Sequence, residues 1–250
     1  WLPRTRQTLY VIKGAQTMTT PNALHHVAIS TADMKSQIAF FSDVLGMSLQ
    51  GLFWMHGVPN AWHAFLAMGE ASFSFVFIPG NEEKETVIGQ THAGTGAGSS
   101  APGTMQHIAL NVDTLDDLLN MRDRIRSRGV PVFGPLDHGL CHSIYFAGPE
   151  NLTLEVATSD QLTHPLDSSG TWIDQDVVNL AGISPEELES YLRPAQFEGQ
   201  DGAVTQPEFD ADKPHLHYPK DAYPVMLEMP DSQFETRPQD REPPSPKAPK

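Results

Sequence analysis

Two histidines and one glutamate occupy positions in the sequence that would suit a metal ion. His26 lies in LHHVAIS and His107 in MQHIALN, at the same place in two similar segments. In both segments apolar residues alternate with other residues, as in a half-buried β-strand. Each histidine lies on the same face of its predicted strand as small residues, which leaves room for a ligand. Glu155 lies in the apolar strand LTLEVA, where a carboxylate is costly to bury unless it is paired or ligates a metal. The two histidines could therefore face a ligand, and Glu155 is expected to be either paired or bound to a metal.

The strands that carry the histidines each begin the same succession of elements. The first helix ends at Gly46, and the second begins with a capping box at Thr114 and ends at Gly129. Further strands follow each helix, and the segments 64–78 and 143–157 both have the pattern of a hairpin around a turn with Gly and Glu. The sequence therefore predicts a β-α-β-β-β module that occurs twice.

The rest of the chain is assigned around these two modules. We expect the following segments: an extension at 1–17, a first module at 18–80, a Gly-rich linker at 81–104, a second module at 105–160, a C-terminal strap with a short helix at 161–235, and a disordered tail at 236–250. The helix of the strap is predicted from the capping box that starts at Ser184, and it should run to about Leu192.

The order of the motifs resembles the vicinal oxygen chelate superfamily. The resemblance rests on L-x-H-V-x-I before a helix, then H-I-A-L, then D-H-G-x-x-x-S-I-Y-F-x-x-P-x-N-x-x-x-E, and it covers about residues 22–158. That superfamily includes glyoxalase I, fosfomycin and bleomycin resistance proteins, and type I extradiol dioxygenases. The resemblance implies an α+β fold in which two tandem β-α-β-β-β modules form an open, metal-centred barrel, with an irregular C-terminal extension.

The resemblance also implies a ligand set. It places His26, His107 and Glu155 together on the inner face of the barrel as a 2-His-1-carboxylate site, which suits Fe(II), with Mn(II) or another divalent metal as alternatives. A repeat offset of 80 residues makes Phe75 the counterpart of Glu155, so the fourth protein ligand of glyoxalase-like members is missing. Tyr145 matches the extradiol pattern, in which a tyrosine ten residues before the ligand glutamate hydrogen-bonds the substrate.

One part of the extradiol pattern is absent. Those enzymes carry a catalytic histidine on the strand where this chain has ASFSFV, and we assign its acid–base role to His138 instead. The function expected from the resemblance is an Fe(II)-dependent extradiol dioxygenase that cleaves a small aromatic diol with O2. Two alternatives stay open: another metal-dependent reaction of the superfamily, such as isomerisation or thiol transfer, and a metal-free binding protein of the resistance type.

The composition of the chain excludes several classes of partner and site. A net charge of −15 leaves no basic stripe for nucleic acid, and no run of 18 apolar residues predicts a membrane-spanning helix. The single cysteine, Cys141, excludes an intramolecular disulfide framework and a zinc site with several cysteines. We expect a cytoplasmic homodimer without nucleic-acid or membrane partners.

Overall fold

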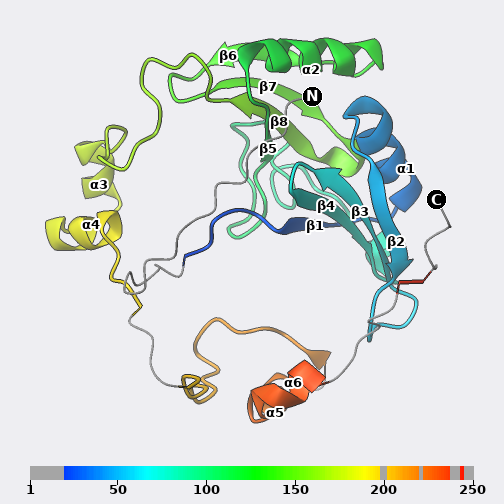
Figure 1. Ribbon diagram of the computed structural model, residues 1–250, viewed down its shortest axis with the longest axis vertical. Helices are drawn as coiled ribbons and strands as arrows, with labels where there is room; N and C mark the ends of the chain where they lie inside the picture. Colours follow the sequence, from blue (N-terminus) through cyan, green and yellow to red (C-terminus); the bar gives the residue numbers. More distant parts are fainter. Residues whose placement is uncertain (1–19, 198–201, 220–221, 237–242, 245–250) are drawn as a thin grey trace, which may run out of the picture. The chain divides into compact units, whose positions relative to one another are not determined.

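The computed structural model describes residues 20–197, 202–219, 222–236 and 243–244 (Figure 1). The predicted extension and nearly all of the predicted tail lie outside the described residues. The larger of two compact units contains Ala23–Ala181, and Gly182–Pro238 belong to the smaller one. Both predicted modules fall within the larger unit.

The first module has the predicted order of elements. Its elements are β1 (His26–Ser30), α1 (Met34–Ala39), a π-helical turn (Phe40–Val44), β2 (Leu49–Trp54), β3 (Trp62–Met68) and β4 (Ala71–Phe77). The side chain of Asp33 caps α1 by accepting a hydrogen bond from the Ser36 amide, 3.0 Å away. The helical segment ends at Gly46, whose φ of 79° is readily adopted by glycine.

The second module repeats this order after a linker that holds one short 3-10 helix (Asn81–Glu83). Its elements are β5 (Ile108–Asn111), α2 (Leu115–Ser127), β6 (Phe133–Asp137), β7 (His142–Ala147), a 3-10 turn (Pro149–Asn151) and β8 (Thr153–Thr158). The predicted capping box is present, because Thr114 and Asp117 hydrogen-bond each other's backbone amides. Gly129 has a φ of 78° just after the helix, as its predicted role requires.

The strands form two four-stranded sheets, in the orders β1-β4-β3-β2 and β5-β8-β7-β6. In each sheet the first strand runs parallel to the last strand of its module, and the remaining pairs are antiparallel. The predicted α+β fold with two β-α-β-β-β modules is confirmed, and the two sheets are not closed into a barrel. Among the described strands, β1 and β5 pair only within their own sheets, so hydrogen bonding stops at these edges.

Strand alternation separates a core face from an open face in both sheets. Phe73 and Phe75 on β4 are fully buried and pack against Phe41 of the helical segment, with ring centroids 4.6 and 4.9 Å away. In the second sheet Leu154 and Val156 of β8 are buried in the same way. Residues next to these buried residues in each strand must therefore point to the opposite face of the sheet. We call this face the open face.

The two modules share one hydrophobic core. Buried residues from both modules form a single cluster, and Phe40 stacks on Phe146 of β7 with ring centroids 6.4 Å apart. Arg124 of α2 extends this contact, since its guanidinium donates to the backbone oxygens of Val44 and Asp43, each at 2.8 Å. The modules are therefore joined through the side that carries their helices.

Glu150, in the turn between β7 and β8, joins the second module to the start of α1. Its carboxylate accepts hydrogen bonds from the Thr31 hydroxyl (2.6 Å), the Gln37 amide side chain (2.6 Å) and the backbone amide of Ala32 (2.7 Å). Burial by itself would raise the pKa of Glu150, but these donors together with the amide of Asp33 outweigh it and lower the pKa. The charged carboxylate is thus the form that holds the modules together.

Short helices make up much of the remaining described chain. They are α3 (Gln175–Leu180), α4 (Pro185–Leu192), α5 (Ala222–Leu227) and α6 (Asp231–Thr236). The predicted capping box at Ser184 and the predicted end at Leu192 are confirmed for α4. The sequence analysis did not predict the other three helices. No helix in the described ranges combines the length and the apolar character needed to cross a bilayer.

We predict that Glu150→Ala lowers the free energy of unfolding by about 2 kcal/mol at pH 7, because hydrogen bonds to a charged group are lost. The folded-state pKa is lowered, so this stabilisation is present above the unfolded value near 4.5 and disappears as the pH falls below it. Urea denaturation at pH 7 and at pH 3 measures both effects.

Glu70→Ala supplies the matched control, because Glu70 occupies the corresponding turn between β3 and β4 and is exposed. This variant should leave the unfolding free energy within about 0.5 kcal/mol of the original. An equal loss of stability in both variants, or a loss in Glu150→Ala that persists unchanged at pH 3, would contradict the role given to Glu150.

Candidate functional site

Glu155 and His107 form a close pair on the open face of the second sheet. Nε2 of His107 lies 2.9 Å from Oε2 of Glu155. The Ser143 hydroxyl donates a hydrogen bond to Oε1 of the same carboxylate. Glu155 is only 4% exposed, so its carboxylate is almost fully removed from water, and the Ser143 hydroxyl is a donor that partly replaces the lost hydration.

Strand register explains how these residues meet. Glu155 faces Ala109 on β5 and Tyr145 on β7, while its neighbours Leu154 and Val156 point into the core. Ala109 is small enough to leave space above the carboxylate, and His107 precedes β5 by one residue. The predicted alternation therefore places His107, Glu155 and Tyr145 on one face.

Tyr145 and His138 meet at the side of this pair. The Tyr145 hydroxyl and Nε2 of His138 share a hydrogen bond of 3.2 Å, and the Tyr145 ring meets the His107 ring edge-on, with centroids 6.1 Å apart. Burial first, and then the charge of Glu155, raises the pKa of Tyr145 above its usual value near 10. The hydroxyl therefore keeps its proton at neutral pH and remains able to donate a hydrogen bond.

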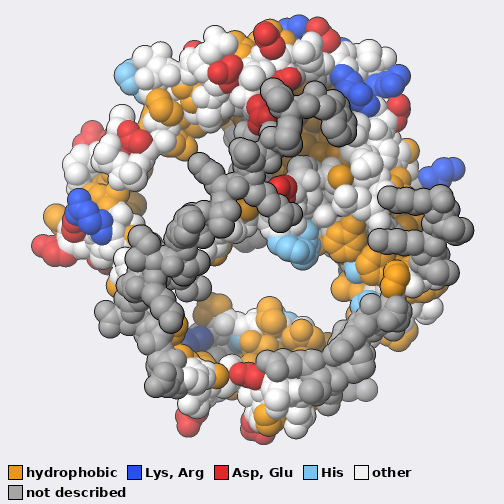
Figure 2. All heavy atoms as spheres, viewed as in Figure 1, with side chains coloured by type: hydrophobic (Ala, Val, Ile, Leu, Met, Phe, Trp, Pro, Cys, Tyr) orange, Lys and Arg blue, Asp and Glu red, His pale blue; other side chains and the backbone are white. Residues whose placement is uncertain are grey.

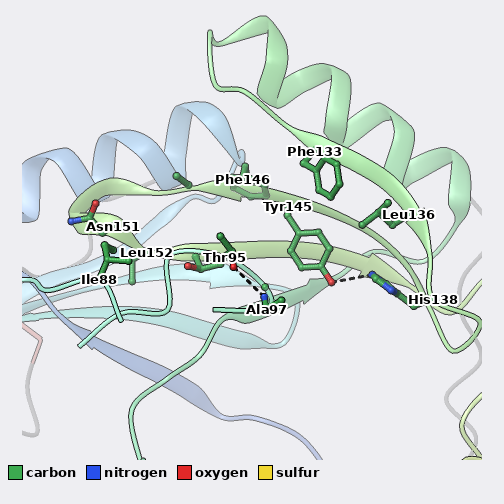
Figure 3. Close-up of a pocket in the computed structure, with 14 residues that line it drawn as sticks. Ile88, Thr95, Ala97, Phe133, Leu136, His138, Tyr145, Phe146, Asn151 and Leu152 are labelled. Atoms are coloured by element: carbon green, nitrogen blue, oxygen red, sulfur yellow. Dashed lines mark hydrogen bonds between the residues drawn. The ribbon is translucent and has the colours of Figure 1, made fainter. Parts of the chain in front are cut away.

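A cavity of about 680 Å³ opens next to Tyr145 and His138 (Figure 3). Most of its wall is apolar and includes Phe133, Leu136 and Phe146, while Tyr145 and His138 face each other at its polar end. Its volume lies in the range of small-molecule sites. The linker between the modules supplies part of the wall through Thr95, Gly96 and Ala97. This segment was expected only to connect the modules, and no feature of its sequence indicated that it lines a cavity.

His26 lies on the other sheet, away from this pair. It is exposed at the start of β1, its Nδ1 lies 2.9 Å from Nδ1 of His25, and its ring meets Phe65 edge-on with centroids 6.0 Å apart. Figure 2 shows histidine side chains beside an apolar patch on the visible face of the molecule. Within the described ranges, no group of three or more His, Cys, Asp or Glu side chains is arranged to hold a metal ion. One chain therefore brings together two of the three predicted ligands.

The pairing of the strands corrects one residue of the sequence analysis. Glu155 pairs with Ala109, and the equivalent partner of Ala28 in the first sheet is Ser74, not Phe75. Phe75 points into the core, whereas Ser74, although also buried, points to the opposite face of the sheet. A serine hydroxyl is a much weaker metal ligand than a carboxylate, so the first sheet still offers no counterpart of Glu155.

Three polar residues near these faces were not identified from the sequence. Ser143 could have been, because it lies two residues before Tyr145 and must share its face. Gln106 contacts Nδ1 of His107 through Oε1, but its position next to a histidine gave no signal. His63 lies on β3, and its Nε2 is buried without a hydrogen-bond partner in the described chain. Burial, followed by the nearby His56 and His26, lowers the pKa of His63.

Comparison with known proteins agrees with this geometry. Residues 23–171 match the model of the Glyoxalase/Bleomycin resistance protein/Dioxygenase superfamily. The chain belongs to this superfamily. The match covers both modules and continues past β8, and it confirms the family that the sequence motifs suggested.

The individual proteins that resemble this chain have low sequence identity to it. Biphenyl-2,3-diol 1,2-dioxygenase 2 of Rhodococcus globerulus is 25% identical over 101 residues, which are 40% of this chain and 42% of that protein. A glyoxalase/bleomycin resistance protein/dioxygenase domain from Frankia sp. EAN1pec aligns with 58% of this chain and 96% of its own, at 14% identity and a TM-score of 0.46. Lactoylglutathione lyase from Agrobacterium tumefaciens aligns with 55% and 94%, at 18% identity and a TM-score of 0.39.

We predict that the protein binds about one divalent ion per chain and that His26→Ala, His107→Ala and Glu155→Gln each release it. Losing one of three ligands removes the geometry that holds the ion. Metal analysis after equilibration with Mn(II), followed by gel filtration, measures the occupancy. His92→Ala is a matched control, because His92 lies in the linker and contacts Thr91. Full occupancy in all three ligand variants would exclude this ligand set.

Proposed function

We propose that this protein is a metal-dependent dioxygenase that cleaves the ring of a small aromatic diol. The observation that supports this proposal is the position of Tyr145, which lines an apolar cavity together with His138 and also contacts the ring of His107, the partner of Glu155. The 25% identity to a biphenyl-2,3-diol dioxygenase over 101 aligned residues supports an aromatic diol as the substrate. In the overall reaction one carbon–carbon bond of the ring breaks and both atoms of O2 enter the product, so no further reductant is required.

The cavity has the shape and chemistry to hold an aromatic ring. Phe133, Leu136 and Phe146 would remove its apolar surface from water, which contributes about 25 cal/mol per Å² buried. The two oxygens of a diol would then lie toward Tyr145 and the His107–Glu155 pair. A substrate without the oxygens would leave these polar groups unpaired, and this provides a basis for selectivity.

Tyr145 and His138 have complementary roles in this proposal. The Tyr145 hydroxyl keeps its proton, so it can donate a hydrogen bond to a substrate oxygen on which negative charge develops. His138, 3.2 Å from that hydroxyl, can take up or return a proton through Tyr145 or directly from the diol. Tyr145 lies on β7 and His138 directly follows β6, so the second module positions both groups.

The metal would be Fe(II), with Mn(II) as the alternative. His107 and Glu155 provide one neutral nitrogen and one carboxylate oxygen, and a bound ion would supply the redox chemistry that lets O2 react with an aromatic diol. His107 and Glu155 are two of the three predicted metal ligands. The third donor, His26, is exposed on the open face of the first sheet.

We infer that a second copy of the chain completes the site. The modules are joined through their helical sides, and His26 on the first sheet is exposed in the single chain. In a two-fold dimer His26 of the partner subunit would meet His107 and Glu155, and the reciprocal contact would form the second site. This arrangement explains how a single chain can contain all three donors without bringing them together.

A mixing experiment tests the shared site. His26→Ala and Glu155→Gln chains are each inactive by themselves, but a mixed dimer would contain one intact site, built from the unaltered His26 of one chain and the unaltered pair of the other. After subunit exchange about one quarter of all sites should be intact, because half of the dimers are mixed and each has one good site of two. Oxygen uptake with a catechol panel and Fe(II) measures the recovery.

The control for mixing is His107→Ala with Glu155→Gln, since both changes affect the same sheet and no intact site can form. Recovery in the first mixture and none in the control supports the dimeric site. No recovery in either mixture, with oxygen uptake by the unaltered protein, would place the whole site within one chain.

We also predict that Tyr145→Phe lowers turnover by about 10- to 1000-fold while metal content and melting temperature stay unchanged. The substitution removes one preorganised donor and keeps the ring. Steady-state oxygen uptake and metal analysis on the same sample check the result. Tyr191→Phe is a suitable control, because Tyr191 is exposed on α4. Unchanged turnover in Tyr145→Phe would assign Tyr145 a purely structural role.

One observation favours a second candidate, a metal-free small-molecule-binding protein. In the described chain the donors do not assemble into a group of three, while the apolar cavity is already formed. Such a protein would bind an aromatic compound without metal and would consume no oxygen. Calorimetric titration with and without a chelator separates the two candidates, because only the dioxygenase needs the ion.

A further inference from the structure

The linker between the modules covers part of the candidate site. Thr95, Gly96 and Ala97 line the cavity beside the Tyr145 ring (Figure 3). A Cβ atom added at Gly96 would lie 3.1 Å from Cε1 of Tyr145, so the backbone here approaches the ring as closely as glycine allows. We call residues 95–98 the roof of the cavity.

Gln106 holds this roof in place. Its Nε2 donates hydrogen bonds to the backbone oxygens of Thr95, at 3.0 Å, and Gly98, at 3.3 Å. The same side chain contacts Nδ1 of His107 through Oε1. One amide group therefore touches both the roof and a candidate metal ligand.

The chemistry of the amide decides which way it points. Its NH2 group can only donate, and it faces two carbonyl oxygens, which can only accept; the opposite orientation would set three acceptors against each other. Oε1 must then face His107, and an amide oxygen can only accept a hydrogen bond. Nδ1 of His107 therefore carries the hydrogen, and the lone pair of a neutral ring lies on Nε2.

Nε2 of His107 points at the carboxylate of Glu155, 2.9 Å away. A lone pair and a carboxylate oxygen repel each other unless a proton or a metal cation lies between them. Removing Gln106 would relieve this arrangement, because the hydrogen could move to Nε2 and bond Glu155 directly. The contact with Gln106 thus keeps His107 in the form that binds a metal ion.

We propose that Gln106 is a positioning residue that sets the tautomer of His107 and ties the roof of the cavity to the metal-binding pair. The proposal rests on the function proposed above in one respect, namely that His107 binds an ion. The tautomer and the order of the roof do not depend on that function, and both can be measured on the protein without metal.

The first measurement is the tautomer of His107. Nitrogen-15 NMR of the histidine side chains at alkaline pH, where the rings are neutral, distinguishes Nδ1–H from Nε2–H, and the His107→Gln variant identifies the signal. We expect Nδ1–H in the unaltered protein and Nε2–H in Gln106→Leu. An Nε2–H ring in the unaltered protein, or an unchanged tautomer in Gln106→Leu, would overturn the proposal.

A second variant separates the two roles of the amide. Gln106→Glu keeps an oxygen that accepts from Nδ1–H but loses the donor to Thr95 and Gly98. It should retain the Nδ1–H tautomer and Mn(II) binding, while the backbone amides of 95–98 exchange hydrogen faster. Gln106→Leu should show the faster exchange and also a 10- to 100-fold weaker Mn(II) affinity, the usual cost of losing a residue that orients a ligand histidine.

Gln175→Leu is the control, because Gln175 is an exposed glutamine on α3. It should change neither exchange in the roof nor Mn(II) binding. If the unaltered protein binds no Mn(II) but the tautomer and the roof respond as expected, the positioning role stands and the proposed function fails. Exchange in the roof that is equal in all variants would overturn the tie between Gln106 and the roof.

Discussion

The buried carboxylate of Glu155 is the constraint on which the candidate site depends. A carboxylate that is 4% exposed loses most of its hydration, which costs several kcal/mol unless donors or a cation replace the water. Ser143 and His107 occupy both oxygens, and Gln106 in turn occupies the far side of His107. A chain of polar contacts therefore extends from the centre of β8 to the linker, and each residue in it has few alternative partners.

The same polar chain is surrounded by apolar surface on which it depends. Leu154 and Val156 direct Glu155 to the open face because they must be buried in the core shared by the two modules. Tyr145 pairs with Glu155 across β7 and β8, which brings its hydroxyl to the edge of the apolar cavity. The arrangement places the Tyr145–His138 hydrogen bond beside an apolar wall, as sites for small amphipathic molecules do.

The packing of the modules accounts for the division of the donors between two faces. Phe40 and Phe146, together with Arg124, join the helical sides of the modules, and Glu150 adds a charged contact at the start of α1. This packing leaves His26 on one open face and the His107–Glu155 pair on another. The proposed three-ligand site would therefore be completed by His26 of the partner subunit, because no third donor of the predicted set lies beside the pair among the described residues.

Local sequence determined most of the individual elements. The caps at Thr114 and Ser184, the glycines at 46 and 129 and the alternation around Glu155 act over a few residues, so their structural effects follow from short-range geometry. Only the tertiary structure decided how the faces are combined. Counting 80 residues selected Phe75, because turns and loops of different length shift the count, whereas backbone hydrogen bonds set the true register at Ser74. The resemblance implied a barrel, but the sides through which the two modules pack are set by long-range burial of Phe40, Phe146 and their neighbours. The contact of Gln106 with the linker is likewise a product of folding, since nothing in the sequence between 95 and 106 requires the chain to turn back over Tyr145.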